Sequence, residues 1–116
     1  MPLVYSEKFT ENRKIAQAFM TAYVKGVRVY SDAFVKNENK EKVIEILARH
    51  AGIDAKIIRD GFPAGLDPDQ RMNVAGIEAF QQLFVEQHFT RDPIDVNKVV
   101  EPSFAEAAVK QLGPYR

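Results

Sequence analysis

The chain lacks cysteine, an excess of charge of either sign, and any long apolar run. Without cysteine it cannot form disulfides, thiolate nucleophiles or the common cysteine-based zinc sites. Its 16 basic residues balance 16 acidic ones, so no overall field attracts a nucleic-acid backbone or an anionic membrane. We therefore expect no nucleic-acid partner.

Targeting and membrane-spanning signals are also missing. No apolar stretch approaches the roughly 20 residues that a transmembrane helix needs. The first residues, MPLVYSEKF, lack the basic and apolar segments of a signal peptide. We expect no membrane insertion and no export signal within the sequence.

The residues that are present predict one helical domain. Apolar residues make up 46% of the chain and charged residues 28%, which is close to the average for globular domains. Apolar positions recur with the helical period, and no segment shows sustained alternation. The prediction is an all-α single domain over residues 1–116, with about four main helices, two short ones and no internal repeat.

Capping residues set the expected boundaries of these helices. Asp67-Pro68-Asp69-Gln70 has the pattern of a capping box with proline at the first helical position, and Ser103 with Glu106 has the pattern of a second box. The expected helices are Thr10 to about Val35, Asn37 or Asn39 to Ala51, a short piece from Asp54 to Gly61, Asp67 to about Phe89, one turn within Asp95 to Val100, and Ser103 to Leu112.

Catalytic and metal-binding patterns are weak. His50 and His88 have no second histidine or carboxylate at the spacing that places two ligands on one helix face. Ser6, Ser31 and Ser103 lack a glycine-flanked elbow, and no glycine-rich phosphate loop occurs. We therefore predict no enzyme activity, no catalytic residue, no metal site and no cofactor.

Asp67, Asp69 and Glu78 could suggest a calcium loop of the EF-hand type. The glycine that this loop needs at its sixth position is replaced by Met72. Helix capping therefore explains the two aspartates better.

The segment Ile46 to Phe62 is similar to a helix-turn-helix, because Ala48 and Gly52 would let two helices cross closely. Its second helix would be short and would offer only Lys56 and Arg59 to DNA. A helical DNA-binding regulator using residues 46–62 is the alternative function.

An apolar and aromatic stripe follows the long first helix. At helical spacing such a stripe is typical of a core or an interface rather than of a ligand site. The stripe consists of Phe19, Tyr23, Val27, Tyr30 and Phe34.

Two stretches carry a resemblance to a known family. One is AQAFMTAYVKGVRVYSD, from Ala16 to Asp32, and the other is LDPDQRMNVAGIEAFQQLFVEQHFTRDPIDVNKVVEPSFAEAAVKQLG, from Leu66 to Gly113. In order and spacing they resemble the C-terminal helical part of solute-binding proteins of ABC transporters, in the NMT1/THI5-like family that serves nitrate, sulfonates, taurine and thiamine precursors.

The resemblance implies a truncated or C-terminal portion of a periplasmic, two-lobed α/β protein that closes on a small solute and docks on an ABC permease. The sheets and most ligand-contacting loops of such proteins have no counterpart in this sequence. We therefore expect a helical scaffold without a complete ligand pocket, and no ligand-binding residue is assigned. Helices that would cover the missing sheets lack their usual partner, and exposed apolar surface favours association. We therefore expect a homodimer in which the stripe of the long helix, defined above, packs against its copy or is exchanged.

Overall fold

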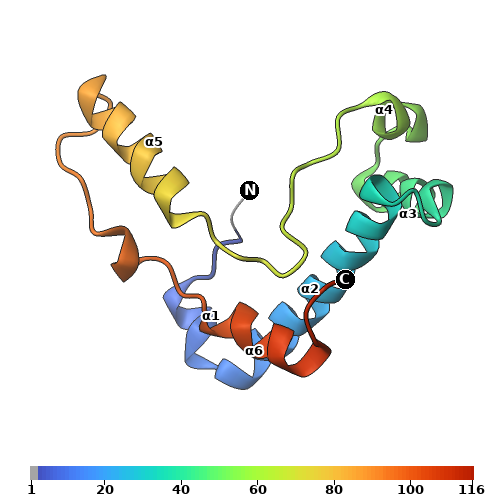
Figure 1. Cartoon of the computed structure of the whole chain (residues 1–116), viewed down its shortest axis with the longest axis horizontal. Helices are drawn as coiled ribbons and strands as arrows, with labels where there is room; N and C mark the ends of the chain where they lie inside the picture. The colour runs from blue at the N-terminus through green and yellow to red at the C-terminus, as the bar shows by residue number, and fades with distance from the viewer. Residues whose placement is uncertain (1–2) are drawn as a thin grey trace.

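The computed structural model describes residues 3–116, and this part of the chain contains α-helices and one 3-10 turn but no strand (Figure 1). Six α-helices are present there, four of them long and two short, so the predicted all-α class and helix number are confirmed. The elements are α1 (Glu7–Glu11), α2 (Arg13–Val35), α3 (Lys40–Ala51), α4 (Ala55–Asp60), α5 (Val74–Glu86), η1 (Val96–Lys98) and α6 (Ser103–Leu112).

The longest helix, α2, starts later than the predicted Thr10. Asn12 leaves the helical conformation and its side chain accepts a hydrogen bond from the Ile15 amide at 3.2 Å, which makes it the N-cap. The residues before it form the separate short helix α1, capped by Ser6. The predicted end at Val35 is correct.

The main core lies between α2 and α6 at the base of the molecule (Figure 1). Alanines on both helices are buried, and small side chains let helix axes approach closely. Tyr5 and Phe9 pack against this cluster, and the Tyr5 hydroxyl donates to the Ala16 carbonyl at 3.0 Å. The buried cluster consists of Ala16, Met20, Val24, Phe104, Ala105 and Ala108.

Two arms diverge from this base (Figure 1). The first arm is α3 with α4: α3 packs on α2 through buried Val43 and Ile44, and Arg59 of α4 pairs with Glu41 of α3 at 2.7 Å. The second arm is α5 with the chain that returns along it. Among the helical elements α5 contacts only η1, and none of its residues is buried.

Both predicted capping boxes are wrong. Asp67 accepts from the Asp69 amide at 2.9 Å within a turn, and Gln70 adopts a left-handed conformation with φ of 57°. A helix cannot continue through that conformation. The helix instead begins at Val74, with Asn73 as its N-cap, and ends at Glu86 rather than Phe89.

At the start of α6, Ser103 is a helical residue and makes no cap bond. Glu101 supplies the acceptor there, because its carboxylate accepts from the Ser103 amide at 2.9 Å. The Ser103 hydroxyl instead accepts from Arg13 of α2 at 3.3 Å.

Candidate functional site

The turn at Asp67 to Gln70 and the C-terminal tail are held to α2 by one charged network. Arg28 of α2 donates to the Asp69 carboxylate at 2.7 Å and to the Gly113 carbonyl at 2.6 Å. The Tyr115 amide also donates to Asp69, at 3.1 Å. The side chains of Arg28 and Asp69 are only 15% and 12% exposed, so this ion pair is shielded from water and fixes the turn in place.

A second group of polar contacts holds the last residues of the chain. The Tyr115 hydroxyl donates to Asp32 at 2.7 Å, and Lys36 donates to the same carboxylate at 2.8 Å. The ammonium group of Lys36 also lies 4.1 Å from the centre of the Tyr115 ring. The hydrogen bonds from Lys36 and then Tyr115 lower the pKa of Asp32, because they stabilise its charged form.

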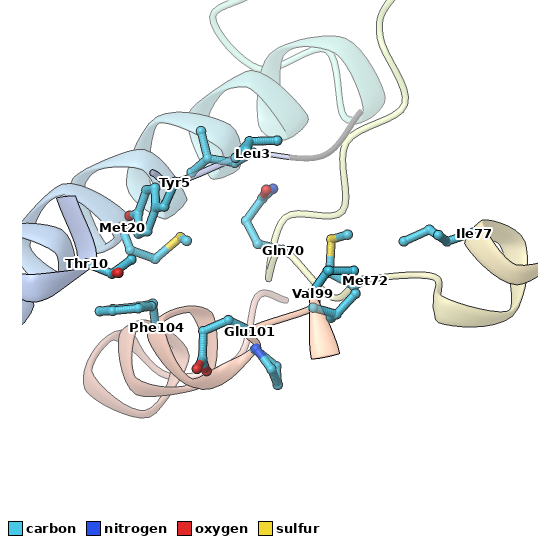
Figure 2. Close-up of a pocket in the computed structure, with 13 residues that line it drawn as sticks. Leu3, Tyr5, Thr10, Met20, Gln70, Met72, Ile77, Val99, Glu101 and Phe104 are labelled. Atoms are coloured by element: carbon cyan, nitrogen blue, oxygen red, sulfur yellow. The ribbon is translucent and has the colours of Figure 1, made fainter. Parts of the chain in front are cut away.

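An open pocket of about 380 Å³ lies between the N-terminal segment, α2, the start of α6 and the turn that leads to α5 (Figure 2). Its walls are mainly apolar. They include Leu3, Tyr5, Met20, Met72, Val99 and Phe104.

The polar groups around this pocket are engaged with the protein itself. Thr10 donates to the Glu7 carbonyl at 2.7 Å, Gln70 donates to the Asp67 carbonyl at 2.5 Å, and Glu101 accepts from Ser103. The hydrogen bonds from Ser103 lower the pKa of Glu101. The pocket therefore suits apolar groups and brings no nucleophile or acid–base pair together.

The histidines lie apart from any candidate site. His50 is exposed in the last turn of α3, as expected for a residue near a helix C-terminus, and His88 is exposed just beyond α5. Within residues 3–116 no three histidine, aspartate or glutamate side chains are grouped so that they could hold a metal ion. No helix in that range is long and apolar enough to cross a membrane.

The structure buries only Val27 of the predicted interface stripe on α2, whereas Phe19 stays 46% exposed and the other three side chains are half-buried. Val27 is 4% exposed, and Phe19 and Tyr23 stack on each other next to the N-terminal aromatic residues. Tyr30 and Phe34 pair with each other at a ring-centre distance of 4.5 Å. The side chain of Val27 is thus not available to a partner, and the predicted dimer through this stripe remains a prediction.

The segment proposed as a helix-turn-helix forms the second half of α3 and the six-residue α4. Gly52 between them adopts the left-handed backbone conformation. Both basic residues of α4 are paired: Lys56 with Asp60, and Arg59 with Glu41. Their charges are therefore partly neutralised before any phosphate could approach.

Exposed apolar residues gather on the two arms, outside the stripe that the sequence predicted as an interface. On the second arm Phe80 is 65% exposed and Phe89 is 76% exposed; on the first arm Ile57 is 65% exposed and Phe62 is fully exposed. The sequence signal was present in α5, where eleven of the thirteen residues are uncharged. A helix that is apolar on most sides is typically buried.

The whole molecule has more surface than its mass requires. Its accessible area is 8961 Å², whereas a folded monomer of 13.1 kDa exposes about 6,400 Å². The radius of gyration is 16.7 Å, against about 13 Å for a compact chain of this length. About 2,500 Å² of surface is therefore in excess, and the apolar arms contribute to it.

Comparisons of the chain with protein-family models, with curated proteins and with solved structures gave no match.

Proposed function

We propose that the chain serves as the C-terminal helical part of a solute-binding protein of the nitrate, sulfonate, taurine and thiamine-precursor type. Its role is to cover and support α/β lobes rather than to hold the solute alone. The carrying observation is the excess of about 2,500 Å² of surface, together with exposed apolar side chains on both arms, on a helical fold that has no sheet in residues 3–116.

The arrangement of the helices supports this role. The α2–α6 base is a packed core, while α5 and the α3–α4 pair project apolar side chains away from it. Helices of an α/β protein pack their apolar face on a sheet and expose the opposite, polar face. The polar groups at the open pocket are already bonded within the chain, which supports a scaffold without a complete solute site.

The test is co-expression of the chain with the α/β lobes of an NMT1/THI5-like protein from which the C-terminal helices have been removed. The expected result is co-purification of the two chains. The complex should then gain thermal stability from nitrate, a sulfonate, taurine or a pyrimidine precursor, because a ligand that binds only the folded state stabilises it. The chain alone should show no such gain. Failure of the two parts to associate would contradict the proposal.

The DNA-binding alternative is less well supported. Ion pairs occupy both basic residues of α4, and that helix has only six residues. The discriminating measurement is a gel shift at low salt, where a real DNA-binding site gives affinity that falls steeply as salt is added. We expect no shift.

A further inference from the structure

We infer that a second copy of this chain covers the two arms, with α5 of each copy packing on the α3–α4 arm of the other. The α5 arm is defined here by Ile77, Phe80, Leu83, Phe84 and Phe89, and the α3–α4 arm by Ile46, Ile53, Ile57 and Phe62. Each arm is an unpartnered apolar surface. In a two-fold dimer the contact between an α5 arm and an α3–α4 arm would form twice, once for each chain. The inference concerns the same exposed arms as the proposed transport role, but with a second copy of the chain as their occupant instead of α/β lobes.

The α5 arm presents its apolar residues on one side. Ile77, Phe80 and Phe84 follow the spacing of three and four residues that places side chains on one helix face. Phe80 and Phe84 stack edge to face, as do Phe84 and Phe89, so the exposed rings already form a continuous aromatic surface. Such clusters of exposed apolar residues mark interaction sites.

The α3–α4 arm offers a complementary surface. Ile46 is 41% exposed and lies between Lys42 and Arg49 on one helix face, since the three residues are spaced by four and three. Neither basic residue has an ion-pair partner in residues 3–116. The only charged residues of α5 are Glu78 and Glu86, so Lys42 and Arg49 on this face have acidic counterparts on the other arm.

A chain cannot easily bring its own two arms together. The linker from α4 to α5 is pinned at Asp69 by the shielded ion pair with Arg28 and by the Tyr115 amide. Closing the arms within one chain would disrupt these contacts, whereas a second copy can fill the space without moving them.

The surface areas also favour a second copy. Stable obligate dimers bury about 2,000 to 5,000 Å² in total over both chains. An excess of about 2,500 Å² on each chain makes about 5,000 Å² for two chains, at the upper end of that range. A two-fold arrangement uses both arms of both chains at once. With equal numbers of acidic and basic residues, the two copies also carry no net repulsion.

The test uses sedimentation velocity with small-angle scattering on the full chain and on Phe80→Glu, Ile57→Glu and the control Ile15→Glu. Ile15 is 54% exposed on α2, outside both arms. We expect the unchanged chain and the control to be dimeric. Phe80→Glu and Ile57→Glu should each raise the dimer dissociation constant by at least about tenfold, since each damages both reciprocal contacts. Circular dichroism checks that each variant is folded.

Mixing Phe80→Glu with Ile57→Glu gives the sharpest result. A heterodimer of these two variants keeps one intact contact, between the unchanged α5 of one chain and the unchanged α3–α4 arm of the other. We expect it to form more tightly than either variant with itself. A dimer that survives Ile57→Glu, or a mixture without recovery, would overturn the pairing of unlike arms.

A monomer for the unchanged chain would overturn the inference, whether it is open or has closed to a radius of gyration near 13 Å. This outcome is distinguishable from failure of the proposed function. A monomeric chain that still co-purifies with α/β lobes would contradict the dimer and support the proposed function. A dimer that does not bind the lobes would support the dimer and contradict the proposed function.

Discussion

At the scale of single residues, Asp69 is the point on which the turn, the tail and α2 converge. Asp69→Ala would leave Arg28 shielded from water without its charged partner, and breaking such a pair from one side costs about 3 kcal/mol. The Tyr115 amide would lose its acceptor as well. We expect urea denaturation followed by circular dichroism to show a loss of free energy of unfolding of that size.

Asp60→Ala is the matched control. This change removes the ion pair between Asp60 and Lys56. The side chain of Lys56 is 77% exposed and that of Asp60 is 58% exposed. An exposed pair of this kind contributes about 0.5 kcal/mol or less. Equal losses in the two variants would show that the Arg28–Asp69 contact does not anchor the tail.

Asp32 predicts a pH dependence. Hydrogen bonds from Lys36 and Tyr115 hold its pKa below the unfolded value, so the folded state favours its charged form. Its contribution is therefore fully present above the unfolded pKa of about 3.9 and is lost as pH falls through the lower folded pKa. Asp32→Asn should make the melting temperature less sensitive to pH in that acidic range.

The control for this measurement is Asp92→Asn, at an exposed position that makes no ion pair in residues 3–116. Calorimetry from pH 6 down to about pH 2.5 should give this control the same slope of melting temperature against pH as the unchanged chain. If Asp32→Asn also keeps that slope, Asp32 does not contribute to acid sensitivity.

At the scale of elements, α5 is the helix least supported by its own chain. It has 13 residues, none of them buried, and isolated helices of that length are marginal in water. Its cap is therefore unusually important: Asn73 accepts from the Gly76 amide at 2.9 Å. Asn73→Ala should cost about 1 kcal/mol and speed amide exchange in α5 roughly fivefold, as measured by hydrogen–deuterium exchange.

Asn12→Ala provides the comparison, because Asn12 caps α2 through the Ile15 amide. The cost of the lost cap should be similar, but α2 is packed against α6 and its central amides should stay protected. An equal local rise in exchange in the middle of α2 would argue against the view that only α5 lacks support.

The sequence predicted those elements whose signals are local. The apolar period located α2 and α6, and Asp54 and Gly52 correctly marked the boundaries of the α3–α4 pair. The Asp67 box failed because its second aspartate is used by Arg28 and Tyr115, which lie 41 and 46 residues away. No local pattern reveals such a distant partner.

The same limit applies to the candidate surfaces. The aromatic stripe on α2 was visible as a pattern, yet only the fold shows that Val27 is buried while Phe80 and Ile57 stay exposed. Helical spacing identifies a face of a helix but not what covers it. The arms could therefore be identified only once the tertiary arrangement was known.

At the scale of the whole molecule, an unusually large surface makes stability depend on association. If two copies cover each other's arms, unfolding and dissociation are coupled, and stability rises with chain concentration. A roughly hundredfold increase in concentration adds about 2.7 kcal/mol to the unfolding free energy. The urea slope is about 1 to 3 kcal/mol per molar for a small chain and about twice that for a dimer that unfolds as two chains. The midpoint should therefore rise by roughly 0.5 to 1.4 M.

Phe80→Glu separates this effect from general stability. Its side chain lies on the exposed face of α5, so folding of the α2–α6 core should survive the change while association is lost. Its urea midpoint should then be nearly independent of concentration, whereas that of Ile15→Glu should still rise. An unchanged chain whose midpoint does not move with concentration would mean that the arms remain uncovered in solution, because only an association step makes an unfolding equilibrium depend on concentration.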